Sequence, residues 1–317
     1  MTTSTTPLRP FQRMAFDALP ERPVRPHPYF DSEAHEVHMD SATLGRLRIH
    51  YREYGSGTPL LLVHGLMTSS YSWRYLLNGL GQRYRLIVPD LPGAGASSAP
   101  PRRLTAAALS AWIGEFQTLL GLHGCPVVGN SLGGYLAMRH ALTDPAAFGA
   151  VINIHSPAIP LPRLHLLHAA LSLPGANSLL QWWIRRDTAR WAHRTVHYYD
   201  ETLKSLEEAR QYGDALATAD GAATFIDYLH GVMAPASFAG FSAELRRRHN
   251  DGKPFPAPLL LIYSRQDPLV PPAVGARLSA LLPQAEFHWL DRSSHFAHAD
   301  TPTAVIELAL PFLRNHR

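Results

Sequence analysis

The chain has few of the features that mark secreted, disulfide-stapled or membrane-spanning proteins. Cys125 is the only cysteine among 317 residues, so no disulfide can form within the chain. The first thirty residues are rich in Thr, Pro and Arg and lack the continuous apolar stretch of a signal peptide. No later apolar run reaches the length of a membrane span. We therefore expect a cytoplasmic protein without a membrane span.

Clustered charge is also scarce. The formal net charge is +4, but the basic residues are spread along the chain and only Arg246 to Arg248 form a run. A nucleic-acid surface needs clustered positive charge, so we expect a solvated surface and no nucleic-acid partner. With 46% hydrophobic and 17% charged residues, the chain can bury a large core, and its length fits one domain that carries an insertion.

Residues 36–157 alternate short β-rich runs with helical stretches. HEVHMD and LGRLRIHYREYG predict two antiparallel strands, and LLLVHG and RLIVPD predict buried strands with continuous apolar runs. The stretch LTAAALSAWIGEFQTLLG predicts a helix that ends at Gly121. CPVVGN and GAVINIHS add two more strands, each next to a helix, as βαβ units require.

The pattern changes twice more along the chain. Residues 158–250 lose the strand signals and are helical and rich in aromatics, which indicates an inserted helical cap. Residues 251–317 return to the α/β pattern with LLLIYSRQD, AEFHWLD and a closing helix from about Thr303. Residues 1–35 carry prolines at 7, 10, 20, 23, 26 and 28, which is typical of an arm that lies along the surface or is partly disordered.

The segment VVGNSLGGYLAMRHAL holds a GxSxG pattern formed by Gly129, Ser131 and Gly133. It follows an apolar strand and precedes an amphipathic helix, which is the context of a nucleophile elbow. In so sharp a turn the glycines avoid backbone collisions, and the serine takes strained dihedral angles at the helix N-terminus, where negative charge is favoured. The pattern predicts Ser131 as a nucleophile, the alternative being a structural glycine-rich turn.

A serine nucleophile needs a base, and the base needs an orienting acid. His295 is favoured among 18 histidines because it lies between the last predicted strand and the last predicted helix, at the sheet edge of Ser131. Asp267 follows a buried strand, and the order Ser, Asp, His is the order expected for such a site. His298 is an alternative base and Asp291 an alternative acid. Asp267 could also be an ordinary turn or capping residue.

The tetrahedral intermediate of acyl transfer requires donors for its oxyanion. His64 and Gly65 end a buried strand, so the backbone N–H of Leu66 is expected to point into the site. The N–H of Leu132, directly after the nucleophile, is its expected partner. The alternative is that HG forms an ordinary turn.

These segments together resemble the α/β-hydrolase superfamily, in the branch of esterases, epoxide hydrolases, haloalkane dehalogenases and carbon–carbon bond hydrolases. The resemblance covers residues 51–312 apart from the helical stretch and rests on HGLMTSSYSWRYLLNGL, VPDLPGAGASS, GNSLGGYLA, LLLIYSRQDPLVP and SSHFAH. It implies an eight-stranded, mostly parallel sheet with helices on both faces and a helical cap inserted after the sixth strand. Ser131, Asp267 and His295 would be its nucleophile, acid and base.

Departures from the family patterns narrow the choice. Dehalogenases and epoxide hydrolases resemble the chain around His64 and Tyr71 but use an aspartate nucleophile, and Ser131 cannot do that chemistry. GNSLGG is similar to the elbow of carbon–carbon bond hydrolases, yet LMTSS replaces their glycine-rich loop after HG. The motif before the base reads SSH instead of the common GH.

The sequence therefore predicts a serine hydrolase that cleaves a small to medium, apolar carboxylic ester through an acyl-enzyme, with no metal or organic cofactor. A carbon–carbon bond hydrolase or lyase with the same triad is an alternative, as is acyl transfer to an acceptor other than water. A further alternative is a non-catalytic homologue that binds a ligand. The natural substrate and the oligomeric state are left open.

Overall fold

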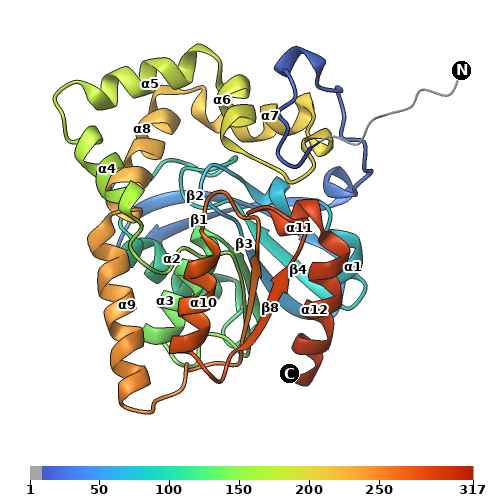
Figure 1. The fold of residues 1–317 in the computed structure, drawn as a ribbon, viewed down its shortest axis with the longest axis vertical. Coiled ribbons are helices and arrows are strands. Elements are labelled where there is room, and N and C mark those ends of the chain that lie inside the picture. The colour runs from blue at the N-terminus through green and yellow to red at the C-terminus, as the bar shows by residue number, and fades with distance from the viewer. Residues whose placement is uncertain (1–8, 317) are drawn as a thin grey trace, which may run out of the picture.

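An eight-stranded sheet runs through the centre of the molecule (Figure 1). The computed structural model describes residues 9–316. The strand order is β1-β2-β4-β3-β5-β6-β7-β8, and β2 alone is antiparallel to its neighbours. The predicted α/β fold with a mostly parallel sheet is confirmed. The strands are β1 (Glu33–Ser41), β2 (Gly45–Tyr54), β3 (Thr58–Val63), β4 (Tyr84–Pro89), β5 (Val127–Asn130), β6 (Val151–Ile154), β7 (Leu259–Ser264) and β8 (Glu286–Leu290).

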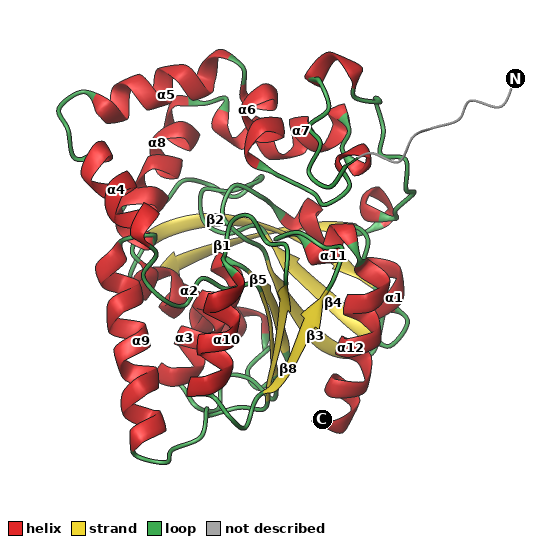
Figure 2. Cartoon of the chain, in the orientation of Figure 1, coloured by secondary structure: helices red, strands yellow, loops and turns green. Residues whose placement is uncertain are grey.

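Helices cover both faces of the sheet, as Figure 2 shows. In β3, Leu61 and Val63 join one buried cluster, whereas Leu60 and Leu62 join the other. Successive strand residues point to opposite faces, so a continuous apolar run is what a sheet covered on both sides needs. The first face is covered by α2 (Ala106–Leu120), α3 (Leu132–Thr143) and α10 (Pro272–Leu281), and the second by α1 (Leu77–Gly81) and α12 (Pro302–Asn315).

The ends of α2 illustrate how local sequence sets an element. The Thr105 side chain accepts a hydrogen bond from the N–H of Ala108, which caps the first turn. Gly121 ends the helix in the left-handed conformation, with φ 65°, which costs glycine little. The predicted end at Gly121 is therefore confirmed.

Six helices lie between β6 and β7, in the stretch expected to form a cap. Figure 1 places α4 to α8 over one end of the sheet and α9 beside α3 and α10. Tyr135 of α3 packs on Phe238 and Phe241 of α9, with ring centroids 4.6 and 5.1 Å apart, so α9 belongs to the packing of the sheet layer. The helices are α4 (Pro162–Leu171), α5 (Ala176–Arg186), α6 (Thr188–Thr195), α7 (Leu206–Gly213), α8 (Ala219–Asp227) and α9 (Pro235–Asn250).

The described N-terminal residues lie against α6 and α7. Backbone hydrogen bonds join Phe11 to Tyr199 and Pro20 to Leu206, both at 3.0 Å or less. The remaining residues of the predicted arm before Arg9 lie outside the described range. β1 begins at Glu33, two residues before the predicted strand HEVHMD, because Glu33 pairs with Glu53 of β2.

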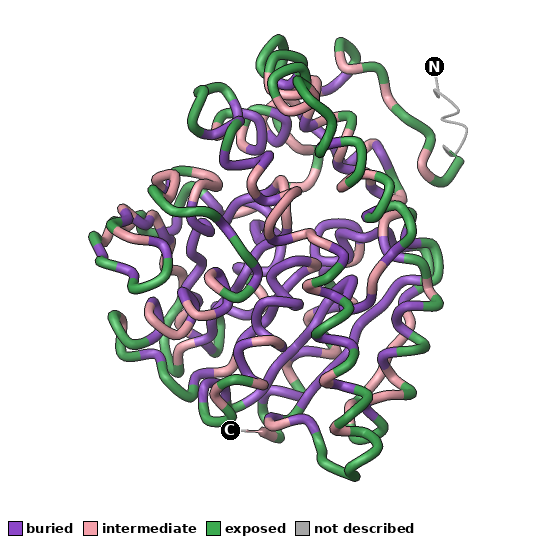
Figure 3. The backbone as a smooth tube through the Cα atoms, turned by 90° about the vertical axis from the view of Figure 1, so that its left-hand side faces the viewer, coloured by how far each residue is buried: buried purple, intermediate pink, exposed green. Residues whose placement is uncertain are grey.

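Burial follows this layered plan, with buried strands at the centre and exposed helix surfaces at the rim (Figure 3). Within residues 9–316, no helix is both long enough and apolar enough to cross a membrane.

A buried cation joins the sheet layer to the helices above it. Arg74 follows a 3₁₀ turn (Ser70–Trp73), is fully buried and forms an ion pair with Glu208 of α7. Its guanidinium also donates to the hydroxyls of Tyr198 and Tyr212, at 3.4 and 3.3 Å. A buried charge is tolerated only when it is paired and hydrogen-bonded, so this cluster fixes α7 to the core.

Replacing Glu208 with Ala should destabilise the protein strongly, because it leaves the Arg74 charge buried and unpaired. We expect the free energy of unfolding to fall by about 3–5 kcal/mol, measured by urea denaturation. The matched control is Glu244→Ala, which breaks the exposed pair with Arg247 and should cost less than about 1 kcal/mol. Equal losses in the two variants would contradict the structural role of the buried pair.

Candidate active site

The turn between β5 and α3 carries Ser131 in a strained conformation. Its φ and ψ are 52° and −116°, a positive φ that a residue with a side chain rarely adopts and that costs about 1–3 kcal/mol. Its N–H donates to the carbonyl of Ile154 at 2.7 Å, which ties the turn to β6. A Cβ on Gly133 would collide with the carbonyl oxygen of Val63, so only glycine lets α3 come this close to β3. The predicted elbow geometry is present.

Asp267 and His295 are in direct contact. The Nδ1–H of His295 donates to Oδ2 of Asp267 at 2.7 Å, and both side chains are buried. The other oxygen, Oδ1, accepts the backbone N–H groups of Leu269 and Val270 at 2.6 and 2.8 Å. Burial alone would raise the pKa of Asp267, but the charge and the hydrogen bond of His295 hold that pKa below its usual value. The carboxylate is therefore ionised and fixes the orientation of the imidazole.

The two alternative residues lie elsewhere. Asp291 is 67% exposed and pairs with Arg265 at 3.3 Å, so it does not orient His295. His298 lies in α11 (Ala297–Asp300), fully buried against Trp73 with ring centroids 4.8 Å apart. The geometry joins Asp267, and not Asp291, to the predicted base.

Two polar side chains hold the loop of His295. Asn130, next to the nucleophile, donates from Nδ2 to the carbonyl of His295 at 3.1 Å. Asp300 accepts the N–H groups of Ser294 and Tyr199 at 2.6 and 3.0 Å. Burial raises the pKa of Asp300 to about 7. The sequence analysis did not identify these two residues. Only the position of Asn130 inside the GxSxG pattern could have indicated a role in the site.

A second histidine, also missed by the sequence analysis, lies behind the pair. The ring of His155 is 5.7 Å from that of His295 and is fully buried at the end of β6. Burial lowers the pKa of His155 to about 3, and its Nε2 accepts the N–H of Ser264 at 2.6 Å. His155 is therefore neutral, and its ring holds Ser264 at the end of β7, three residues before Asp267.

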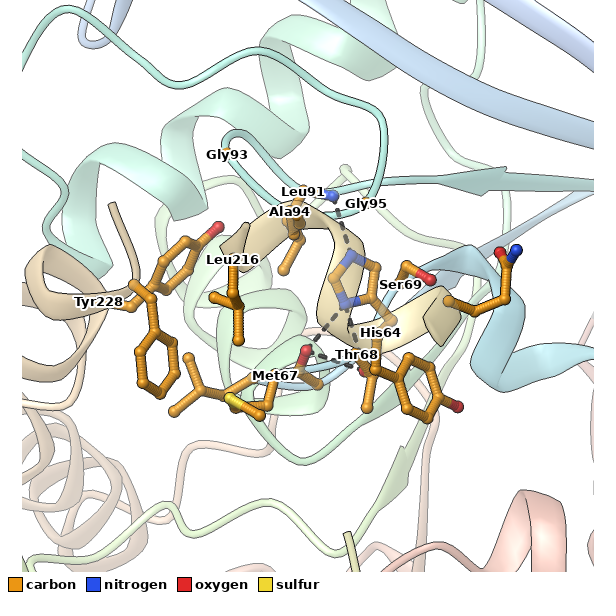
Figure 4. Close-up of a pocket in the computed structure, with 16 residues that line it drawn as sticks. His64, Met67, Thr68, Ser69, Leu91, Gly93, Ala94, Gly95, Leu216 and Tyr228 are labelled. Carbon is orange, nitrogen blue, oxygen red and sulfur yellow. Dashed lines mark hydrogen bonds between the residues drawn. The ribbon is translucent and has the colours of Figure 1, made fainter. Parts of the chain in front are cut away.

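The loop after β3 lies directly against the nucleophile. A Cβ placed on Gly65 would be 3.3 Å from the Cβ of Ser131, so the backbone itself borders the site. The carbonyl of Gly65 accepts two hydrogen bonds, from Nδ1 of His64 at 2.7 Å and from the hydroxyl of Thr68 at 3.0 Å (Figure 4). Since Nε2 of His64 accepts the N–H of Leu91 at 2.9 Å, the ring proton is on Nδ1.

These bonds set the direction of the next backbone donor. In a trans peptide the C=O and the N–H point in opposite directions. With the Gly65 carbonyl held toward His64, the N–H of Leu66 faces away from that side chain. Among the described residues no acceptor bonds the N–H of Leu66 or that of Leu132, the first residue of α3. Both donors are thus free to receive a substrate oxygen.

Two cavities lie on either side of this loop, since Gly65, Leu66 and Met67 line both. The smaller, of about 30 Å³, is the one beside His64 in Figure 4. The larger, of about 350 Å³, is lined by Ser131 and His295 together. Its walls are mainly apolar and come from Pro157, Leu161, Leu164, Leu167, Val196, Leu229, Met233, Leu269, Val270 and Phe296. Arg163 is the only Lys, Arg, Asp or Glu among the described residues that line this cavity.

Solved structures share this architecture. An epoxide hydrolase, CorEH, superposes with a TM-score of 0.74 over 90% of this chain and 100% of that chain, at 19% identity. A haloalkane dehalogenase, DatA from Agrobacterium tumefaciens, has a TM-score of 0.73 over 92% and 100%, at 22% identity. At these identities the likeness shows the fold alone.

Curated relatives match by sequence as well. A 2-hydroxy-6-oxononadienedioate/2-hydroxy-6-oxononatrienedioate hydrolase of Paraburkholderia phymatum is 29% identical over 283 residues, which are 84% of this chain and 91% of the relative. A 2-hydroxy-6-oxo-6-phenylhexa-2,4-dienoate hydrolase of Burkholderia cepacia is 26% identical over 294 residues, covering 88% and 96%.

The family model described as alpha/beta hydrolase fold matches residues 58–302, well over half of the chain. This match agrees with the resemblance deduced from the sequence motifs. The chain belongs to the alpha/beta hydrolase fold family.

Proposed function

We propose that the protein is a serine hydrolase that cleaves a carboxylic ester through an acyl-enzyme. The observation that carries the proposal is the 2.7 Å hydrogen bond from His295 to Asp267, because His295 also lines a cavity together with Ser131. A carboxylate-oriented imidazole beside a strained serine is the arrangement that activates a hydroxyl as a nucleophile.

The reaction follows from the roles of these groups. His295 accepts the proton of the Ser131 hydroxyl through Nε2 while Oγ attacks the ester carbonyl, and the N–H groups of Leu66 and Leu132 bind the oxyanion. His295 then protonates the leaving alcohol, and the acyl group stays on Ser131. Water, deprotonated by His295, attacks the acyl-enzyme. The bond to Oγ of Ser131 then breaks, His295 returns the proton to Oγ, and the acid is released.

The helices α4 to α8 serve as the cap in this proposal, whereas α9, the last part of the expected cap (residues 158–250), packs on α3. Leu164 and Leu167 of α4 and Val196 after α6 contribute apolar walls to the cavity. A cavity of about 350 Å³ with such walls suits a small to medium apolar acyl group.

A second candidate is a carbon–carbon bond hydrolase that uses the same three residues. The relatives named above are hydrolases of this kind, and their named substrates are carboxylates. Arg163 lines the cavity, and its guanidinium, which donates to the carbonyl of Leu269, could bind the carboxylate of such a substrate. Burial lowers the pKa of Arg163, as expected for a cation on an apolar wall.

Replacing Ser131 with Ala should abolish turnover of short-chain aryl esters, because no other group can form the acyl-enzyme. Labelling by a fluorophosphonate probe, which reacts only with an activated serine, should be lost with it. Ser178→Ala, at an exposed position of α5, is the control and should label as the wild type does. Ester turnover that persists in the folded Ser131→Ala variant would exclude Ser131 as the nucleophile.

The identity of the acid can be tested by a matched pair. Asp267→Asn should lower kcat by about four orders of magnitude, since the amide favours the wrong imidazole tautomer. Asp291→Asn should leave kcat unchanged, because that carboxylate is exposed and paired with Arg265. Steady-state kinetics of both variants on one aryl ester gives the two kcat values. A large loss of kcat in Asp291→Asn alone would assign the role of the acid to Asp291.

Substrate comparison separates the two candidates. We expect wild-type kcat/KM for aryl butyrates to exceed that for 2-hydroxy-6-oxo-6-phenylhexa-2,4-dienoate; the opposite order would favour carbon–carbon cleavage. In that case Arg163→Gln should raise KM for the dienoate by about tenfold or more, because the variant loses a hydrogen bond to a charged group. The KM for the ester should stay unchanged. The control is Arg277→Gln, at an exposed position of α10.

A further inference from the structure

The outer face of α5 is apolar although it faces solvent. Leu179, Trp182 and Trp183 are 64%, 56% and 51% exposed. Their spacing of three and four residues places them on one stripe of the helix. Large apolar side chains gathered on an exposed helix face mark a contact surface, because scattered single residues are the normal condition.

This stripe is not needed to hold α5 in place. The inner face of α5 packs through Leu180 and Ile184 against Leu216 and Phe225 of the segment around α8. Figure 1 shows α5 along the outer edge of the molecule, with α8 beneath it. The helix therefore has two apolar faces. On the outer face Trp183 packs edge-on against Trp191 of α6, with ring centroids 4.9 Å apart, yet more than half of each stripe side chain stays exposed.

Positive charge gathers at the C-terminal end of the stripe. Residues 179–194 contain four arginines and one aspartate, a formal charge of +3 in a chain whose total is +4. A surface pocket of about 280 Å³ brings together two tryptophans and three of these arginines; its lining residues are Trp183, Arg186, Asp187, Arg190, Trp191 and Arg194.

The arginines of this pocket differ in their partners. Arg190 is paired with Asp17 and Asp187, at 2.7 and 2.9 Å. Arg186 and Arg194 pair with no carboxylate among the described residues. The guanidinium of Arg186 lies 4.9 Å from the ring centre of Trp182, so cation and aromatic ring are presented together.

We propose that the α5 face docks on an anionic phospholipid surface. This face is defined by Leu179, Trp182, Trp183 and Arg186 of α5 together with Arg194 of α6. Tryptophan favours the boundary between headgroups and acyl chains, leucine enters the acyl region, and arginine binds lipid phosphate. An amphipathic helix with Trp and Leu on one face and arginines at its edge is the arrangement that lies in a membrane interface without spanning it.

The same features argue against two other partners. A two-fold dimer through this face would bring two segments of formal charge +3 into one interface, and like charges would repel. A nucleic-acid backbone would satisfy the arginines but would leave Leu179 without an apolar contact. An anionic bilayer satisfies both kinds of side chain.

The docking face continues toward the larger cavity along α4. Leu164 and Leu167 of this helix line that cavity, whereas Leu166 is 75% exposed on its outside. Leu173, in the connection between α4 and α5, is 64% exposed. A bilayer bound at α5 would thus lie next to a wall of the cavity. The docking itself does not depend on the proposed reaction.

Cosedimentation with vesicles tests the proposal on the full chain. We expect the protein to bind vesicles that mix phosphatidylglycerol with phosphatidylcholine, but not vesicles of phosphatidylcholine alone, and to dissociate at high salt. The double variant Arg186→Gln/Arg194→Gln should bind about 25-fold more weakly, since each arginine near an anionic surface contributes about fivefold. Leu179→Gln/Trp182→Gln should also weaken binding.

Leu119→Gln is the matched control, because Leu119 is an exposed leucine of α2 outside this face. It should bind vesicles as the wild type does, and circular dichroism should show that all variants are folded. Failure of the wild type to bind, or equal losses in the control, would overturn the proposal. A dimer in size-exclusion chromatography that Trp182→Gln dissociates would assign the face to a second copy instead.

Discussion

The close approach of α3 to the sheet is the constraint on which the rest of the site depends. Gly129 and Gly133 have backbone atoms where a Cβ would stand, and between them Ser131 takes a positive φ. The turn fits because the serine N–H reaches the carbonyl of Ile154 in the neighbouring strand. The strain of about 1–3 kcal/mol is borne by this packing. Without that approach, neither the serine nor the first N–H of α3 would border the cavity.

The three histidines of the site differ in their hydrogen-bond partners. His64 and His155 are fully buried, their pKa values are lowered first by burial, and each accepts a backbone N–H through Nε2. Both remain neutral and serve as fixed hydrogen-bonding spacers between loops. His295 differs because an ionised carboxylate receives its Nδ1–H.

Local pattern was sufficient for the sheet, the elbow and the ends of α2, because each is set by residues close together in sequence. It favoured Asp267 as the acid but kept Asp291 as an alternative, because both follow a predicted strand and the choice depends on which carboxylate reaches His295. Contacts between segments that are distant in the sequence could not be predicted either. Arg74 and Glu208 are 134 positions apart, and an isolated arginine or glutamate gives no sign of its partner. Arg163 was missed because a single cation in a helical stretch normally faces solvent.

The helices over the cavity are attached to the core with unequal strength. α7 is held by the buried Arg74 cluster, and separating it would expose an ion pair that is costly to break. In α4 only Leu164 and Leu171 are buried, and in α5 only Ile184. Because local opening costs least where little apolar surface is buried, we expect α4 and α5 to open more readily than α7. Leu164 and Leu167 of α4 line the larger cavity, whereas no residue of α7 does, so an opening of α4 would widen this cavity while α7 stays in place.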